Sequence, residues 1–134
     1  MSSPTAGSGA VGELNPEYEI SPQAAAAGLR EGPGRLVLID CRTEAEWAFA
    51  HVSGSVHIPL DELAIRTDEI DLPAGSTLAI ICHHGKRSLR GALALREQGL
   101  HAMSVAGGIE AWSLRVDSSV RRYTRQGNVI SPVA

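Results

Sequence analysis

The sequence predicts a single α/β domain, built on a mainly parallel sheet with helices on both faces. Two continuous apolar runs, Leu36–Ile39 and Leu78–Ile81, have the pattern of strands that are buried on both faces. Segments with helical spacing alternate with these runs and with weaker strand candidates, which favours parallel strands joined by crossover helices. The 134 residues, 43% of them hydrophobic, are enough for one such core.

The remaining elements are recognised by the signals at their ends. Ser21 followed by Pro22 is typical of a helix start, and a short strand is expected to end just before it. Thr43 and Glu46 have the spacing of a capping box, and Gly99 is typical of a helix end. Helices are therefore expected over residues 23–29, 43–50, 61–70, 87–98 and 109–113. Further short strands are expected over residues 55–58 and 102–105.

Both ends of the chain have little apolar patterning. Residues 1–15 are rich in Ser, Gly and Ala and are expected to form a flexible tail, so that the domain spans residues 16–116. Residues 117–134 are polar and are expected to form a C-terminal extension. This extension contains Arg121, Arg122 and Arg125. We interpret these arginines as solvated, with docking of an acceptor protein as the alternative.

Composition argues against several classes of protein. No apolar run approaches the roughly 20 residues that a membrane helix needs. Residues 1–7 have neither the basic region nor the apolar core of a secretion signal. The two cysteines, Cys41 and Cys82, argue against a disulfide scaffold and for a reducing compartment, so a cytoplasmic location is expected. No basic run is interleaved with aromatic residues, which argues against nucleic acid as a partner.

The net charge of −3 is unevenly distributed along the chain. Residues 1–71 carry 4 basic and 12 acidic side chains, a balance of −8. Residues 72–134 carry 8 basic and 3 acidic side chains, a balance of +5. The basic half would suit a small anionic substrate, although chance scatter over solvated surface would give the same asymmetry.

The segment with the clearest chemical meaning is Cys82-His83-His84-Gly85-Lys86-Arg87-Ser88. It predicts a buried strand that ends at a cysteine, followed by a glycine turn that leads into a helix. Backbone N–H groups at the N-terminus of that helix, together with two adjacent cations, would favour an anion. The same field would favour the thiolate form of the cysteine, which is the nucleophile. We therefore expect an anion-binding, nucleophilic Cys82.

Four segments, taken in order, resemble the rhodanese-like (sulfurtransferase) domain over about residues 20–112. They are Leu38–Arg42 with Glu44, Glu46 and Trp47, then His51–Pro59, the loop Cys82–Ser88, and Ala106–Trp112. The resemblance implies a doubly wound fold with a five-stranded parallel sheet. It also implies that Cys82 takes a sulfane sulfur from a small anionic donor such as thiosulfate and holds it as a persulfide. The sulfur then passes to a thiol or cyanide, and no cofactor is implied.

The loop residues are assigned to the substrate site by their chemistry. Lys86 and Arg87 would balance the charge of an anionic donor, and Gly85 would let the backbone curl without a side chain in the cup. Ser88 is expected to donate its hydroxyl or to cap the helix that follows. The pair His83-His84 is expected to shape the mouth of the loop, with a solvated, inert His83 as the alternative. No matching pair of ligands lies elsewhere, which argues against a metal site.

Two residues after the first buried strand are ambiguous. Arg42 is counted with the substrate-binding residues, because it would add positive potential near the pocket. Its other role is a structural ion pair with Asp40 or Glu46, which its position directly after the strand favours. Cys41 is either a resolving thiol for a persulfide on Cys82 or a residue packed against the sheet, and packing is favoured.

Other functions would use the same loop chemistry. A phosphatase or arsenate reductase of the same fold also pairs a cysteine with an arginine, but with five residues between them. Here four residues separate Cys82 from Arg87, which gives a smaller cup that suits a sulfur atom better than a tetrahedral phosphate. A sulfur-carrying or interaction module that serves a larger pathway would keep the same cysteine. The sequence favours the sulfurtransferase and does not name its physiological donor or acceptor.

Overall fold

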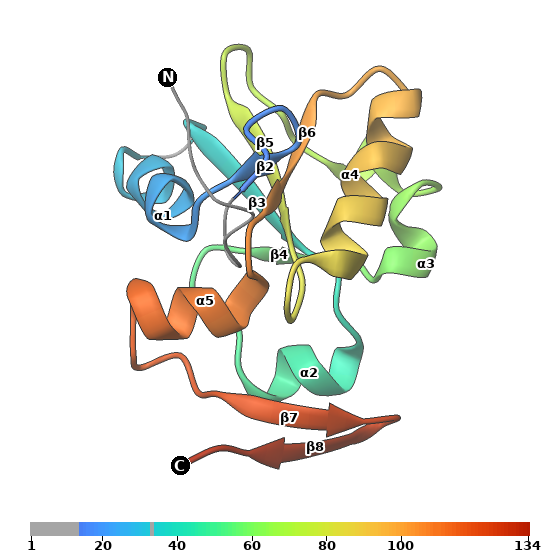
Figure 1. The fold of residues 1–134 in the computed structure, drawn as a ribbon. Helices are drawn as coiled ribbons and strands as arrows, with labels where there is room; N and C mark the ends of the chain where they lie inside the picture. Colours follow the sequence, from blue (N-terminus) through green and yellow to red (C-terminus); the bar gives the residue numbers. More distant parts are fainter. Residues whose placement is uncertain (1–13, 33) are drawn as a thin grey trace.

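The computed structural model describes residues 14–32 and 34–134. The predicted flexible tail, residues 1–15, falls mainly outside them. The centre of the molecule is a five-stranded sheet in which all neighbouring strands are parallel (Figure 1). Its strands lie in the order β2 (Glu19–Ile20), β6 (Ala102–Val105), β5 (Thr77–Ile81), β3 (Leu36–Asp40) and β4 (Val56–His57). The predicted fold class is confirmed.

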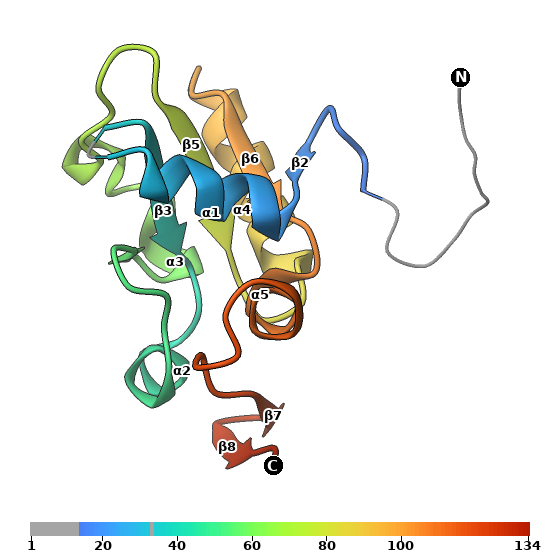
Figure 2. The same cartoon turned by 90° about the vertical axis from the view of Figure 1, so that its left-hand side faces the viewer.

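Helices cover both faces of the sheet. One face carries α1 (Pro22–Arg30) and α5 (Gly108–Arg115), and the other carries α3 (Leu60–Leu63) and α4 (Lys86–Glu97) (Figures 1 and 2). Side chains of the central strand β5 pack into the core on both faces of the sheet, because successive side chains of a strand point to opposite faces. Its residues Ala79 and Ile81 join the core cluster on the side of α1 and α5, whereas Leu78 and Ile80 join the cluster on the side of α4.

The predicted helix caps are present. The hydroxyl of Ser21 accepts the N–H of Ala24 at 3.0 Å, at the start of α1. Thr43 and Glu46 form a capping box at the start of α2 (Glu44–Phe49). A cap of this kind satisfies backbone donors that have no partner within the helix and contributes about 1 kcal/mol. The second cap also turns Glu46 into the interior, where it is fully buried.

The predicted helix over residues 61–70 is wrong. The chain forms the four-residue helix α3 and then only a 3₁₀ turn, η1 (Thr67–Glu69). Gln98, at the end of α4, explains the difference. Its side chain donates to the carbonyl of Ala64 at 2.8 Å and accepts from the hydroxyl of Thr67 at 3.2 Å. A tertiary hydrogen bond thus takes the carbonyl that a continuous helix would use for its own ladder.

The predicted polar extension is a folded hairpin rather than a solvated tail. β7 (Tyr123–Gln126) and β8 (Val129–Pro132) pair in antiparallel fashion. The hairpin lies beneath α2 and α5, beyond the carboxyl ends of the sheet strands (Figure 2). Tyr123 is only 2% exposed and joins the core on the side of α5. Among the described residues, no helix is long and apolar enough to cross a membrane.

Candidate functional site

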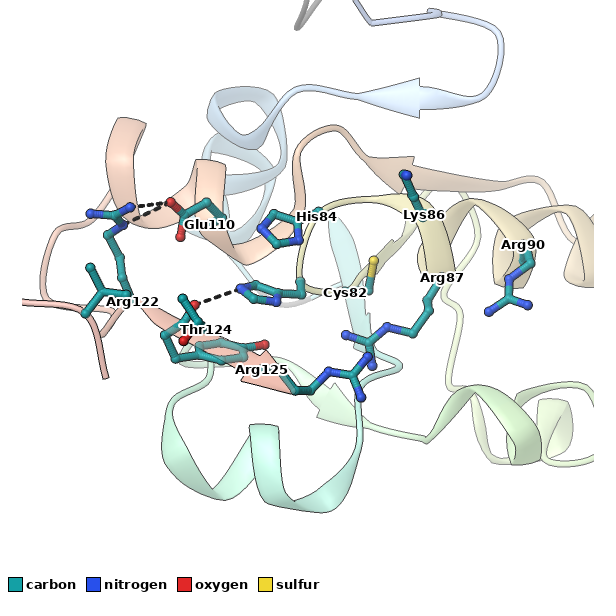
Figure 3. A pocket seen from close by; sticks show the side chains of 12 residues that line it. Cys82, His84, Lys86, Arg87, Arg90, Glu110, Arg122, Thr124 and Arg125 are labelled. Atoms are coloured by element: carbon teal, nitrogen blue, oxygen red, sulfur yellow. Dashed lines mark hydrogen bonds and ion pairs between the residues drawn. The ribbon is translucent and has the colours of Figure 1, made fainter. Parts of the chain in front are cut away.

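The candidate site lies at the carboxyl ends of the central strands, where residues 82–88 connect β5 to α4. A pocket of about 730 Å³ opens there between this loop, α4, α5 and the β7–β8 hairpin (Figure 3). Open α/β sheets place their ligand sites in this position. Five of the residues assigned to the site from the sequence line the pocket, namely Cys82, His83, His84, Lys86 and Arg87.

Cys82 lies at the base of this pocket. Its Sγ accepts the N–H of Gly85 at 3.0 Å, and its thiol donates to the hydroxyl of Ser88 at 3.3 Å. The residue is 1% exposed, so a substrate reaches the sulfur only through the pocket. A hydrogen bond from an N–H group is stronger to an ionised acceptor than to a neutral one. The loop therefore places a backbone donor against the sulfur at the base of the pocket.

Glycines allow the loop to take this shape. Gly85 is the N-cap residue of α4 and has a φ of 100°, in the left-handed region that other residues rarely adopt. A Cβ on Gly85 would also lie 3.2 Å from the backbone nitrogen of Gly107. The start of α5 holds the loop from the other side, because the N–H of Ile109 donates to the carbonyl of Cys82 at 2.8 Å. The loop and the N-terminus of α5 are thus packed backbone against backbone.

Ser88 and Gly85 do not line the pocket, but each forms a hydrogen bond with the sulfur of Cys82. Ser88 is fully buried, and its hydroxyl lies 2.7 Å from the hydroxyl of Ser104. Ser104 in turn donates to the carbonyl of Gly85 at 3.4 Å. The N-cap position of α4 belongs to Gly85, so Ser88 does not have the capping role considered for it.

A buried carboxylate holds Arg87 at the pocket wall. Both terminal nitrogens of Arg87 donate to Glu46, one to each carboxylate oxygen, at 2.8 Å. Burial by itself would raise the pKa of Glu46. Hydrogen bonds from Arg87 and Tyr123 outweigh that effect and keep the pKa far below its ordinary value. Glu46 is therefore ionised at neutral pH and fixes the guanidinium of Arg87 beside the loop.

Tyr123 joins the hairpin to the cysteine loop. Its ring stacks on the ring of His83, with centroids 4.0 Å apart, and its carbonyl accepts a hydrogen bond from Nε2 of His83 at 3.1 Å. Burial, and then the neighbouring His84, lower the pKa of His83 to about 4. The ring is therefore neutral at pH 7. With 7% of its surface exposed, His83 is a packed part of the loop and not the solvated residue of the alternative interpretation.

Arg42 does not reach the pocket, which corrects its assignment as a substrate-binding residue. Its side chain is fully buried and pairs with Asp40, Nη2 to Oδ2, at 2.6 Å. It also donates to the carbonyl of Ala50 at 2.6 Å and to the hydroxyl of Tyr123 at 3.1 Å. The structural ion pair with Asp40 is thus the role that the fold gives it, because no surface of Arg42 is open to a ligand.

Cys41 is buried one position beyond the pairing of β3 with β5, in the same core cluster as Cys82. Burial, and then the negative charge of Cys82, raise the pKa of the Cys41 thiol. A protonated, buried thiol suits the packing role better than the role of a resolving nucleophile.

Several residues of the pocket were missed by reasoning from the sequence. They are Arg90, Glu110, Tyr123, Thr124 and Val133, whereas Arg122 and Arg125 were expected to be solvated, with docking of an acceptor protein as the alternative. Arg90 lies one helical turn after Lys86, so helical spacing could have placed it on the same side. The hairpin residues had a signal of another kind, because Gly127-Asn128 between two short runs is typical of a two-residue hairpin turn. No pattern in the sequence shows where that hairpin packs.

The charge of the pocket lining is positive, although Arg87 is paired with the buried Glu46. Five cationic side chains line the pocket, and Glu110 is the one carboxylate among the lining residues. Glu110 is occupied by Arg122, Oε2 to Nη2, at 2.6 Å. Among the described residues, no group of three or more His, Cys, Asp or Glu side chains could hold a metal ion. The arrangement can thus bind an anion over a buried sulfur.

The fold and the site together define a doubly wound α/β domain with one cysteine loop beneath a cationic pocket. A model of the Rhodanese-like domain family matches residues 21–115, well over half of the chain. The chain belongs to this family, and the resemblance described from its motifs is confirmed.

Two curated relatives and one solved structure illustrate the match. Thiosulfate sulfurtransferase GlpE of Pseudomonas fluorescens is 33% identical over 115 residues, which cover 84% of this chain and 96% of that protein. "Putative sulfur carrier protein YrkF" of Bacillus subtilis is 35% identical over 79 residues, which cover 58% of this chain but only 42% of that longer protein. A rhodanese-related protein of Thermoplasma volcanium has a TM-score of 0.64 at 25% identity and covers 74% of this chain and 93% of its own.

Proposed function

We propose that this protein is a sulfurtransferase, which moves a sulfane sulfur from thiosulfate or a similar anionic donor to a thiol or cyanide through a persulfide on Cys82. The observation that carries the proposal is the position of Cys82, whose sulfur accepts a backbone N–H at the base of a cationic pocket. The name of the GlpE relative, a thiosulfate sulfurtransferase, supports the same class of donor.

The first half of the reaction loads the cysteine. The Cys82 thiolate attacks the outer sulfur of thiosulfate, and a new S–S bond forms at Sγ. The S–S bond of thiosulfate breaks, and sulfite leaves with the electron pair. Two anions must approach each other in this step, so Lys86 and Arg87 at the pocket wall offset their repulsion. A charge-assisted hydrogen bond of this kind contributes about 1.5–3 kcal/mol.

The second half returns the enzyme to its starting state. An acceptor nucleophile attacks the outer sulfur of the persulfide and takes it. The persulfide S–S bond breaks, and its electron pair remains on Sγ of Cys82. The N–H of Gly85 then stabilises the thiolate that has been released, as it did before loading.

A sulfur-carrying module is the second candidate function. It is supported by the relative whose name describes a sulfur carrier, and it uses the same persulfide. The two functions differ in the second half-reaction, because a carrier transfers quickly to a partner protein and slowly to cyanide. A phosphatase of the same fold is disfavoured by the loop, which is one residue shorter than that pattern requires. The cytoplasmic location stays a prediction.

Mass spectrometry of the intact protein after incubation with thiosulfate tests the proposal. We expect a gain of one sulfur atom, about 32 Da, on the peptide that contains Cys82. Cys82→Ser should take up none, whereas the matched variant Cys41→Ser should still be loaded. Wild-type protein that stays unloaded, or that releases phosphate from an aryl phosphate instead, would exclude the sulfurtransferase.

A further inference from the structure

The pocket is larger than the proposed donor needs. Its volume is about 730 Å³, whereas thiosulfate is a small inorganic ion and one water molecule occupies about 30 Å³ in the liquid. Pockets of roughly 300–1,000 Å³ typically hold organic ligands of drug-like size. Part of the wall comes from Thr124, Arg125 and Val133, which lie beyond residues 21–115 of the family match. These residues thus extend the wall of the pocket beyond the segment that the family model matches.

Arg125 reaches the pocket from β7 with most of its donors free. Its Nε lies 3.7 Å from Oε2 of Glu46, but the oxygens of Glu46 already accept hydrogen bonds from Arg87 and Tyr123. Among the described residues, the hydrogen bond to the carbonyl of Gly127, at 3.2 Å, is the one that the Arg125 side chain makes. A guanidinium carries several N–H donors, and this side chain is 31% exposed.

The surrounding charges leave room for a further anion at Arg125. Glu46 is one carboxylate between two guanidinium groups, so this trio of side chains keeps an excess positive charge. Figure 3 shows Arg125 extending from the hairpin toward Arg87, while Lys86 projects from the start of α4 above Cys82. The donor anion bound beside the sulfur and a second anionic group bound by the hairpin would thus use different cations.

We propose that Arg125 binds a carboxylate of the sulfur acceptor, which is then a low-molecular-weight thiol that carries carboxylate groups. This inference rests on the proposed sulfurtransferase function and names the class of its second substrate. The hydroxyl of Thr124 and the apolar side chain of Val133 line the same wall and would contact the body of such a thiol.

The transfer step balances without any further reactant. The thiolate of the acceptor attacks the outer sulfur of the Cys82 persulfide and forms a new S–S bond. The S–S bond to Cys82 breaks, its electron pair stays on Sγ, and the acceptor leaves as a persulfide. One S–S bond is exchanged for another, so no external oxidant or reductant is required.

The test compares two thiols in the second half-reaction. Glutathione is the carboxylated probe and 2-mercaptoethanol is the uncharged probe. Cys82 is first loaded with thiosulfate and its persulfide verified by mass. The rate of transfer is then measured against the concentration of each thiol. The readout is the ratio of kcat/KM for glutathione to kcat/KM for 2-mercaptoethanol, which cancels any general effect on the cysteine.

We expect Arg125→Ala to lower this ratio about tenfold through a higher KM for glutathione, because a charge-assisted hydrogen bond is lost. Arg125→Lys keeps the charge and should restore most of the ratio. Arg121→Ala removes the same charge from outside the pocket, where the guanidinium lies 4.1 Å above the ring of Phe49, and should leave the ratio as in the wild type.

Two results would overturn the inference. One is an unchanged ratio in Arg125→Ala, including the case in which both thiols react equally slowly. The other is an equal fall of the ratio in Arg121→Ala. That result would mean that the overall positive charge of the protein, and not a contact with Arg125, attracts glutathione. A wild-type protein that never acquires the persulfide would refute the proposed function instead, so the two failures are distinguishable.

Discussion

The hydroxyl of Tyr123 donates a hydrogen bond of 2.6 Å to Oε2 of Glu46, across 77 positions of the sequence. The same hydroxyl accepts from Arg42 at 3.1 Å, and the same carboxylate holds Arg87. One phenol therefore connects the C-terminal hairpin, the buried Arg42–Asp40 pair and the wall of the cysteine pocket. Because all these groups are buried or partly buried, each depends on the others to satisfy its charge or its hydrogen bonds.

Tyr123→Phe is expected to destabilise the protein by about 1–3 kcal/mol. The ring would still stack on His83, but Glu46 and Arg42 would each lose a buried hydrogen-bond partner. The midpoint of urea unfolding measures the effect. Tyr18→Phe is the matched control, because the other tyrosine of the chain contacts Arg96 through its ring. Equal midpoints for the two variants would show that the hydroxyl of Tyr123 contributes nothing.

Glu46→Gln is expected to cost more stability and to slow persulfide formation. The change leaves Arg87 without its buried counter-charge, and breaking such a pair typically costs about 3–5 kcal/mol. It also frees Arg87 from its position at the pocket wall, so loading of Cys82 by thiosulfate should slow. Glu44→Gln, on the exposed side of the same helix, should change neither quantity by much. A Glu46→Gln protein with wild-type loading would show that Arg87 needs no such anchor.

Stability is expected to fall as the pH drops from 7 to 5. The pKa of His83 is lowered to about 4 in the folded protein, so the unfolded chain binds this proton more readily in that interval. The contribution of the neutral ring is thus complete above about pH 6.5 and is lost progressively below it, by about 2 kcal/mol at pH 5. The lowered pKa of Glu46 acts only below the ordinary range of a carboxyl group, outside this window.

Urea unfolding at pH 7 and pH 5 measures this dependence. His83→Gln keeps a donor toward the carbonyl of Tyr123 but does not titrate, so its stability should vary less between the two pH values. The same fall in the wild type and in His83→Gln would mean that another group is responsible.

Gly85→Ala is expected to impair both the fold and the loading of Cys82. A left-handed backbone conformation costs a residue with a Cβ about 1–2 kcal/mol, and here the new Cβ would also press on the backbone of Gly107. Relief of that contact would move the N–H that Cys82 Sγ accepts. Gly99→Ala is the control, because Gly99 has a similar φ of 88° and no atom within 4 Å of the added Cβ. Gly99→Ala should lose stability through backbone strain but should still be loaded with sulfur by thiosulfate. Equal loading of Gly85→Ala and Gly99→Ala would contradict the role of Gly85.

The sequence by itself determined the parts of this protein that depend on neighbouring residues. The runs Leu36–Ile39 and Leu78–Ile81 predicted the two central strands, because a strand buried on both faces must be apolar throughout. The capping box of Thr43 and Glu46 predicted α2, because its hydrogen bonds close within four residues. The loop that begins at Cys82 was recognisable for the same reason.

Only the tertiary structure decided which distant groups meet around that loop. Glu46 neutralises Arg87 from 41 positions away, and Arg42 turns to Asp40 and Tyr123 instead of the pocket. The helix expected over residues 61–70 was interrupted by Gln98 from α4. Each of these outcomes is a competition for hydrogen bonds and charge between segments far apart in the chain. Such a competition leaves no local period or cap in the sequence, because it is settled only when burial removes water as the alternative partner.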